Sequence, residues 1–305
     1  MKGAFDMTLR YLRIFEAVCR HMSITRAAQE LYLSQPSVSL AIGELEKKYE
    51  VRLFDRIGKK LYLTPAGEEL LGYARPLLSQ IDDMEQHLRS GARKSILRVG
   101  VSMTVGSCLL PACAEQFAGD YPDIRVEALV ERTSLIEQKV LENELDIGFV
   151  EGLPKAPQLI ISPFAEDELA VVCAPDSALL RRGAIRCADL ASIPLLLREK
   201  GSGTRAVVDN LTDMQGVTLK PLWESMSTLA LISGAKRGLG AAILPLRIVQ
   251  KDLDRGELAI LPVEDVQWKR QFFRIQHRNK ILDEPAEHWA RLMAACAAGE
   301  LPDPD

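Results

Sequence analysis

No stretch of the 305-residue chain approaches the roughly 20 consecutive apolar residues that a membrane-spanning helix needs. The beginning of the chain does not resemble a secretory signal either. Asp6, Arg10 and Arg13 interrupt its apolar residues, and no small-residue cleavage site follows. Both absences predict a protein that works in the cytoplasm and has no membrane partner.

The six cysteines form no CxxC pair, and the four histidines lie elsewhere in the chain. A zinc site needs such ligands in a cluster, and a disulfide framework is typical of short secreted chains. We therefore expect no metal and no other cofactor, and we expect most of the thiols to be small buried hydrophobes. The cysteines are Cys19, Cys108, Cys113, Cys173, Cys187 and Cys296.

Common catalytic motifs are missing as well. The chain has no GxSxG, no HExxH and no phosphate-binding Walker loop. The run Gly201-Ser202-Gly203 lacks the strand that leads into a dinucleotide-binding fingerprint. The sequence therefore predicts that the protein is not an enzyme.

Charge is unevenly distributed along the chain. Residues 1–64 hold 11 Lys and Arg against 7 Asp and Glu, a net charge of +4, whereas the whole chain has a formal net charge of −4. The remainder is therefore acidic, at −8. A basic head on an acidic body favours a polyanion as the partner of the head.

The first fifty residues have the pattern of three short helices. Ser23 can cap the second helix, which contains the small pair Ala27-Ala28, and Ser34 can cap a third helix over residues 35–48. Small side chains let two helices approach closely at a tight turn. Two short helices of this kind, the second opening with small polar residues, form a helix-turn-helix, whose second helix enters the major groove of DNA.

Two strand-like runs follow, residues 51–56 and 60–64, and they flank a basic tip as in a two-stranded wing. Glutamine can pair with adenine, serine can reach a base or a phosphate, and the basic tip suits phosphates. The residues expected to contact double-stranded DNA are Thr25, Arg26, Ser34, Gln35, Pro36, Ser37, Ser39, Arg56, Lys59 and Lys60.

A long helix is predicted from Pro65 to about residue 92, with Thr64 as its cap and a kink at Pro76. Its apolar residues have the spacing of a coiled-coil seam, which favours pairing of two copies of the chain. A helix packed on its own domain would show the same pattern. Residues 90–95 then have the composition of a hinge. The seam residues are Leu70, Ala74, Leu77, Ile81, Met84 and Leu88.

Strands and helices alternate from residue 95 to about 300, which predicts parallel sheets covered by helices. The length suits two lobes, lobe I at about 95–165 and 269–300 and lobe II at about 166–268. Strands are expected at 97–101, 124–130, 145–150, 168–174, 194–197, 217–223, 239–244, 258–262 and 271–276, and helices at 109–119, 135–142, after 202, from 227 and at 285–297.

Three polar segments, residues 102–104, 198–205 and 225–228, each follow an expected strand. Ligands bind at the carboxyl ends of strands in open α/β sheets, so these segments could line one cleft. Hydroxyls and free helix N–H groups that converge in this way form an anion site. Alternatively, the hydroxyls only cap their helices. Arg198 either adds charge to the site or pairs with Glu199.

The run SITRAAQELYLSQPSVSLAIGELEKKYEVRLFDRIGKKLYLTPAGEELL closely resembles the N-terminal signature of LysR-type transcriptional regulators. The resemblance implies a winged helix-turn-helix domain in 1–64, a linker and dimerisation helix in 65–92, and a two-lobed α/β effector domain like periplasmic binding proteins in 95–300. It also implies a sequence-specific DNA-binding regulator that forms dimers and the tetramers usual in the family. One departure is Glu50, where the family usually has a left-handed glycine, so this turn should be strained or built differently.

The segment REKGSGTR, residues 198–205, resembles the branch of the family that regulates sulfur-assimilation and carbon-fixation genes. The resemblance implies that a small effector, which the polar segments suggest is an anion, modulates promoter binding. The expected effector-binding residues are Ser102, Thr104, Arg198, Ser202, Gly203, Thr204, Ser227 and Thr228.

Two other functions fit parts of the sequence. A thiol-based redox-sensing regulator of the same family would share the whole architecture, but no cysteine lies in the expected pocket segment 198–228. A solute-binding protein would share the fold of the sensor, but it would need an export signal and no DNA-binding head.

Overall fold

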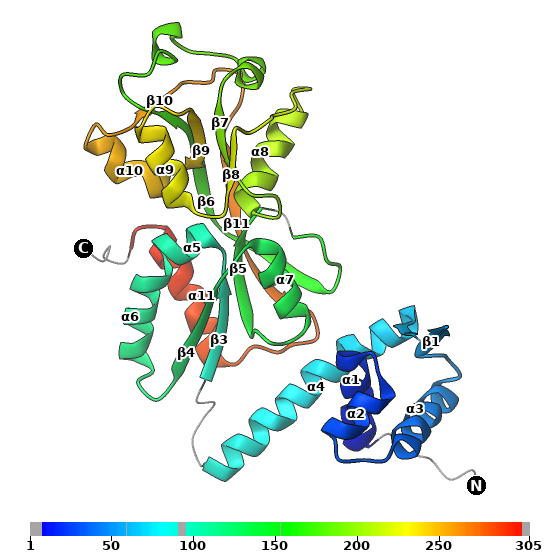
Figure 1. Ribbon diagram of the computed structural model, residues 1–305. Helices are drawn as coiled ribbons and strands as arrows, with labels where there is room; N and C mark the ends of the chain where they lie inside the picture. Colours follow the sequence, from blue (N-terminus) through cyan, green and yellow to red (C-terminus); the bar gives the residue numbers. More distant parts are fainter. Residues whose placement is uncertain (1–7, 59, 91–95, 153, 301–305) are drawn as a thin grey trace. The chain divides into compact units, whose positions relative to one another are not determined.

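The computed structural model describes residues 8–58, 60–90, 96–152 and 154–300, and contacts between Cα atoms divide the chain into two units. Unit 1 comprises residues 1–94 with 279–281, and unit 2 the rest. Unit 1 carries a helix-turn-helix and unit 2 is an α/β domain with two lobes (Figure 1). The predicted fold class is confirmed.

Unit 1 is built on three helices, α1 (Leu9–His21), α2 (Ile24–Glu30) and α3 (Gln35–Tyr49). A two-stranded antiparallel wing of β1 (Phe54–Ile57) and β2 (Lys60–Leu63) follows, and then the long helix α4 (Pro65–Ser90). Phe15, Val38 and Leu45 lie in the single hydrophobic core that these elements share.

Side-chain caps set the beginnings of three of these helices. The hydroxyl of Ser23 accepts a hydrogen bond from the backbone N–H of Arg26 at 3.3 Å, and that of Ser34 accepts from Ser37 at 3.2 Å. Thr64 caps α4 in the same way, through the N–H of Gly67 at 3.1 Å. Each cap satisfies a backbone donor that has no partner within its helix. The caps predicted from the sequence are therefore confirmed.

Glu50 ends α3 in the left-handed conformation, with φ of 56°. A side chain at this φ crowds its own backbone, and glycine does not. We expect Glu50→Gly to stabilise the end of α3 by about 1 kcal/mol, equivalent to about fivefold slower hydrogen exchange of the α3 amides. Glu50→Ala is the control, because it removes the carboxylate but keeps the crowded Cβ. Equal protection in both variants would contradict this explanation.

Helix α4 packs in part on its own unit. Ala74 and Leu78 are buried in the core of unit 1, and Leu70 packs against that core. The prediction that Leu70 and Ala74 belong to a seam between two chains is therefore wrong, because α1 and the wing already occupy that side of α4. The helix continues through Pro76, which lies within its bounds.

The rest of the predicted seam remains accessible. Leu77 is 45% exposed and Met84 is 52% exposed, and Ile81 is half-buried. Tyr73, 47% exposed, lies one turn before Leu77 on the same side of the helix. The hinge was expected at 90–95, but Ser90 is the last residue of α4. Residues 91–95 and the side chain of Leu88 lie outside the described residues. The available stripe is therefore Tyr73, Leu77, Ile81 and Met84.

Lobe I of unit 2 is a sheet with helices on both faces (Figure 1). Strand β3 pairs in parallel with β4 and β5, and β11 joins β5 antiparallel. Helices α6 and α11 cover one face, and α7 covers the other. The elements are β3 (Ile96–Val101), α5 (Met103–Cys108), α6 (Leu110–Asp120), β4 (Arg125–Val130), α7 (Thr133–Leu141), β5 (Ile147–Glu151), β11 (Lys269–His277) and α11 (Glu284–Ala297).

Strand β6 (Leu159–Cys173) runs from lobe I into lobe II, where it pairs with β9 and β10. The strand order across both lobes is β4-β3-β5-β11-β6-β9-β7-β8, with β10 beside β6. Lobe II contains the 3-10 helices Leu180–Arg182 and Cys187–Ser192, then β7 (Leu195–Arg198), α8 (Gly203–Asp213), β8 (Trp223–Ser225), α9 (Thr228–Lys236), β9 (Ala241–Pro245), α10 (Leu246–Asp254) and β10 (Ala259–Ile260).

Several expected elements of unit 2 differ from those found. The sheets are mixed rather than parallel, because β6 pairs antiparallel with β11, β9 and β10. The strand predicted over 217–223 is wrong for most of its length, since only Trp223–Ser225 is a strand. The helix predicted at 109–119 is confirmed as α6, whereas α5, which lies just before it, and α10 were not predicted.

Among the described residues, no helix has the length and apolar character needed to cross a membrane. In the same part of the chain, no group of three or more His, Cys, Asp or Glu side chains could hold a metal ion.

Candidate functional site

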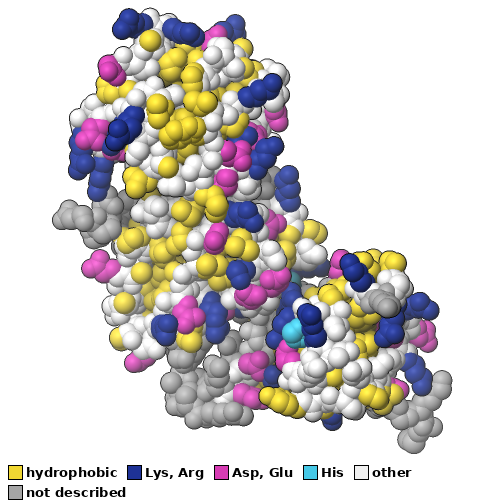
Figure 2. Space-filling model, in the orientation of Figure 1, with side chains coloured by type: hydrophobic (Ala, Val, Ile, Leu, Met, Phe, Trp, Pro, Cys, Tyr) yellow, Lys and Arg dark blue, Asp and Glu magenta, His cyan; other side chains and the backbone are white. Residues whose placement is uncertain are grey.

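The candidate DNA-binding surface lies on α2, α3 and the wing of unit 1. Nine of the ten residues expected to contact DNA have exposed side chains, and Lys59 lies outside the described residues. Lys and Arg side chains are spread over the surface of this unit (Figure 2). The exposed residues are Thr25, Arg26, Ser34, Gln35, Pro36, Ser37, Ser39, Arg56 and Lys60.

The hydroxyls at the start of α3 are partly used within the chain. Ser34 Oγ lies 2.8 Å from Ser37 Oγ, in addition to its bond with the Ser37 N–H. This pair fixes the first turn of α3 and leaves Gln35 and Ser39 exposed. The first turn is therefore held in place before any ligand binds.

Arg270, at the start of β11, is the centre of the candidate effector site in unit 2. Its guanidinium donates to Thr104 Oγ1 of lobe I at 3.0 Å and to Thr204 Oγ1 of lobe II at 2.8 Å. It also pairs with Asp167 of β6 at 2.6–2.7 Å. One buried cation therefore joins hydroxyls of both lobes to the strand that connects the lobes.

Glu151, the last residue of β5, lies next to Arg270. Its carboxylate accepts hydrogen bonds from Ser102 Oγ at 3.0 Å and from Thr204 Oγ1 at 3.2 Å. The nearest guanidinium nitrogen of Arg270 is 3.7 Å away. This carboxylate occupies the position among hydroxyls and a cation that an anionic ligand would take.

The two lobes touch at this point, and the site is closed. A Cβ on Gly203 would lie 2.3 Å from Glu151 Cγ, so only glycine permits this approach of α8 to β5. The side chains of Ser102, Thr104, Ser202 and Thr204 are almost completely buried. A ligand can reach these hydroxyls only if the lobes or Glu151 move.

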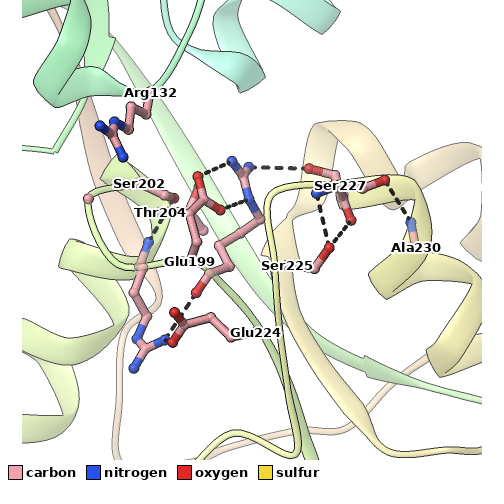
Figure 3. Close-up of polar contacts among 12 residues, drawn as sticks. Arg132, Glu199, Ser202, Thr204, Glu224, Ser225, Ser227 and Ala230 are labelled. Carbon is pink, nitrogen blue, oxygen red and sulfur yellow. Dashed lines mark hydrogen bonds and ion pairs between the residues drawn. The ribbon is translucent and has the colours of Figure 1, made fainter.

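The third polar segment, residues 225–228, lies to one side of Ser202 and Thr204 (Figure 3). Arg198 is buried and pairs with Glu199 through two hydrogen bonds of 2.9 and 3.1 Å, and it donates to Thr228 Oγ1 at 3.2 Å. Its charge is therefore balanced within the chain. Ser227 remains exposed, although its hydroxyl caps α9 through the N–H of Ala230 at 3.2 Å.

Arg132, just before α7 in lobe I, lies beside the loop that precedes α8 (Figure 3). A Cβ built on Gly201 would lie 3.8 Å from Arg132 Cδ, and the Arg132 side chain is exposed. Arg132 was not predicted from the sequence. It adds a cation at the edge of the candidate site.

Glu151, Asp167 and Arg270 were also missed in the sequence. Arg270 and Asp167 lie in runs of charged residues that resemble solvent-exposed strand ends, but both are almost completely buried. Glu151 ends the run DIGFVE, where a charged residue after four positions of buried strand could have indicated a site.

An open groove of about 1200 Å³ lies between α5, α10 and the end of α11, and Asp167, the partner of Arg270, is among its lining residues. Its charged lining residues are Arg247, Lys251, Lys269, Glu166, Asp167, Glu168 and Asp254. Four carboxylates against three cations do not favour an anion there. The cluster around Arg270 is the better candidate for the site predicted from the sequence.

The six cysteines are free thiols, and four of them are buried. Burial raises the pKa of Cys19 to about 12 and that of Cys108 to about 11. Burial also raises the pKa values of the Cys113, Cys173 and Cys187 thiols. These five thiols stay protonated near neutral pH, and the thiolate is the reactive form.

Two family models match the chain. A model described as "Bacterial regulatory helix-turn-helix protein, lysR family" covers residues 9–68. A model described as "LysR substrate binding domain" covers residues 90–297. The first match spans the helix-turn-helix and the wing, and the second spans both lobes of unit 2.

Similar proteins extend over nearly the whole chain. An uncharacterized HTH-type transcriptional regulator of Escherichia coli, YeiE, is 35% identical over 97% of this chain and 99% of its own length. A RuBisCO operon transcriptional regulator of Allochromatium vinosum is 32% identical over 96% of this chain and 97% of its own length. The latter agrees with the carbon-fixation branch indicated by residues 198–205.

Two solved structures have a similar fold. Full-length OxyR from Pseudomonas aeruginosa superposes with a TM-score of 0.65 at 23% identity, covering 96% of this chain and 95% of that chain. The regulatory domain of Synechocystis CcmR, solved in complex with 2-PG, has a TM-score of 0.60 at 28% identity. The superposition covers 66% of this chain and 97% of the CcmR domain.

Proposed function

The chain belongs to the LysR family of transcriptional regulators, and from that membership we propose that a small anion bound in unit 2 controls its binding to a promoter. Members of the family bind DNA, respond to small effectors and form oligomers. We place this activity in the cytoplasm, where bacterial DNA is found. The proposed division is a DNA-binding head in 1–64, a dimerising linker in 65–92 and an effector domain in 95–300.

For the head, we propose that α3 enters the major groove and that the wing contacts phosphates. This assignment is supported by the exposure of Gln35 and Ser39 on a helix whose first turn is already fixed by Ser34 and Ser37. Exposed Arg56 and Lys60 on the wing supply cations for the backbone.

For the effector site, the observation that carries the proposal is the position of Glu151. Its carboxylate accepts bonds from Ser102 of lobe I and Thr204 of lobe II, and Arg270 lies within 4 Å. The site therefore already binds one carboxylate, its own. An anionic effector would compete with this carboxylate for the same hydroxyls.

The proposed effector-binding set keeps the residues expected from the sequence and adds Arg132 at its edge. Arg198 is assigned a supporting role, because it is paired with Glu199 and orients Thr228. The expected residues are Ser102, Thr104, Arg198, Ser202, Gly203, Thr204, Ser227 and Thr228. The solved complex of the CcmR regulatory domain with 2-PG supports a small ligand in a domain of this fold.

An anion that displaces Glu151 would also break the contacts between Glu151 and lobe II. A ligand shifts a conformational equilibrium only by its difference in affinity for the two states. Such a ligand would therefore change how the lobes meet, and this change is the signal that we propose reaches the head.

Removal of single hydroxyls tests this site. We expect Thr104→Ala and Thr204→Ala to weaken an anion found by thermal-shift screening by about ten- to hundredfold, because each removes a hydrogen bond to a charged group. Binding of a promoter duplex without effector should stay nearly unchanged, since both residues lie in unit 2. Isothermal calorimetry gives the first quantity and fluorescence anisotropy gives the second.

Ser233→Ala is the matched control, because Ser233 is exposed on α9, the same helix that Thr228 begins. It should bind the anion as the wild type does. Unchanged affinity in both threonine variants would place the effector elsewhere. Equal loss of promoter binding without effector would assign the threonines to folding rather than to sensing.

The redox-sensing alternative is less well supported by the thiols. Burial raises the pKa values of the five thiols described above, and these include Cys108, the thiol whose pKa the charges of Arg270 and Glu151 also influence. Peroxide-dependent loss of promoter binding in the wild type, absent after cysteine replacement, would favour that alternative.

A further inference from the structure

The fully exposed residues of α3 are uncharged where a DNA-reading helix meets the bases, and Glu44, which follows Gly43, is half-buried. Leu40 is 65% exposed, and Pro36, Ser39 and Gly43 are exposed around it. All of α3 is described, and before Lys47 none of its exposed residues carries a charge. This face therefore offers the bases apolar and hydroxyl groups rather than the cations that commonly recognise guanine.

Gly43 lies on this face without a structural reason in unit 1. A Cβ built on Gly43 meets nothing within 4 Å, and its φ is not in the left-handed region. Glycine within an exposed helix is less stable than alanine, so unit 1 alone would favour a larger residue. Glycine is typical of positions where a ligand or another backbone approaches closely.

Basic side chains lie beside this face. Ser39 and Gly43 border a hollow of about 540 Å³ between α3 and the wing, and Arg52 and Arg56 line its other side together with Asp55. The carboxylate of Glu46, which also lines the hollow, accepts hydrogen bonds from the backbone N–H groups of Leu53 and Phe54. Both arginines are exposed. A duplex seated against Gly43 would thus bring its phosphates toward these two arginines.

From these observations we infer that Leu40 reads a thymine through its C5 methyl group and that Gly43 lets α3 approach the groove closely enough for this contact. In the major groove, the methyl group is the apolar feature that distinguishes thymine from cytosine. The inference rests on the proposed DNA-reading role of α3 and adds the base that one of its side chains recognises.

The test pairs a change in the protein with a change in the DNA. Duplexes are first selected from a random-sequence library with the full-length wild-type protein. Each thymine of a selected half-site is then replaced in turn by deoxyuridine, which lacks only the methyl group. We expect one thymine in each half-site whose replacement by uracil weakens binding of the wild-type protein about fourfold. This is the change in the dissociation constant that corresponds to burial of one methyl group. Leu40→Ala should bind the thymine and uracil duplexes equally well.

Leu222→Ala, an exposed leucine of unit 2, is the control and should keep the uracil penalty. If Leu40→Ala keeps the same penalty at every thymine, or if the wild type shows none, the inference is overturned. If no duplex is enriched at all, the DNA-reading role itself fails, and the two failures are thereby distinguishable. Binding is measured at low salt, where contacts to phosphates keep the weaker variant measurable.

Gly43→Ala tests the close approach by a separate route. The α3 amides should exchange more slowly in this variant, because alanine stabilises the helix, yet the selected duplexes should bind several-fold more weakly. Unchanged DNA binding in a variant with a more stable α3 would show that no close approach occurs at Gly43.

Discussion

A chain that carries both Leu77→Asp and Ile81→Asp is expected to lose its dimer and, with it, about 100-fold or more of its affinity for a promoter with two half-sites. Leu77 is 45% exposed on α4 and Ile81 lies one turn further along. Together with Tyr73 and Met84 they form the apolar stripe that the core of unit 1 leaves uncovered. Carboxylates on this stripe would be buried without a partner in the dimer, at a cost of several kcal/mol.

The expected loss of DNA affinity follows from geometry. Two heads held together bind two half-sites as one event, whereas separate heads must each bind alone. Analytical ultracentrifugation measures the oligomer, and fluorescence anisotropy on duplexes with one and two half-sites measures the binding. The single-site duplex should be bound almost equally by variant and wild type, because α3 and the wing are unchanged.

The variant Leu77→Met with Ile81→Leu is the control, because it keeps the volume and the apolar character of both positions. It should remain a dimer and bind as the wild type does. An aspartate variant that keeps its oligomer and its tight binding to the two-site duplex would mean that α4 does not hold the dimer.

Local features of this fold were predictable from the sequence because their cause is local. A helix cap needs one hydroxyl and a backbone N–H three residues later, so Ser23, Ser34 and Thr64 can be identified without the tertiary structure. Glu50 could be identified as unusual from the sequence because the end of a helix is also a local feature, at which glycine is common. In the structure Glu50 does adopt the left-handed conformation.

The long strand β6 was missed in its first half because its sequence has the features of a loop. Pro163 cannot donate a hydrogen bond to a neighbouring strand, and three acidic residues follow at 166–168. In the structure the register between β6 and β11 shifts beside Pro163, between Phe272 and Phe273, which accommodates the proline at an irregularity. Antiparallel pairing of β6 with β11 and β9 then makes the sheet mixed.

The centre of the candidate site was not predictable because its contacts are distant in sequence. Arg270 bonds to Thr204, Asp167 and Thr104, which lie 66, 103 and 166 residues away along the chain. The hydroxyls were identified because they follow strands and open helices. The charged residues that bind them lie within strands, where alternation does not show which charged side chain faces inward.

Replacement of Arg270 should cost the most stability of any single change considered. Arg270 is 1% exposed, and it pairs with Asp167, which is 0% exposed, at 2.6 Å. In Arg270→Met the buried carboxylate of Asp167 would keep only Arg247, which is 37% exposed and 3.4 Å away, and loss of one partner of a buried ion pair costs about 3–5 kcal/mol. Arg270→Met, which keeps an extended side chain without charge, is therefore expected to lower the free energy of unfolding of unit 2 by about that amount.

The control variant changes another arginine of β11, and the rescue variant changes Asp167, the partner of Arg270. Arg274→Met removes an arginine four residues further along β11 whose partner, Glu287, is 37% exposed, and it should cost about 1 kcal/mol or less. Adding Asp167→Asn to Arg270→Met removes the buried carboxylate that Arg247 alone would then balance, and should recover roughly 1–3 kcal/mol. Chemical denaturation followed by tryptophan fluorescence reports on unit 2, because Trp223, Trp268 and Trp289 all lie there. If the double variant were no more stable than Arg270→Met, the loss would come from the broken threonine contacts between the lobes rather than from the stranded carboxylate.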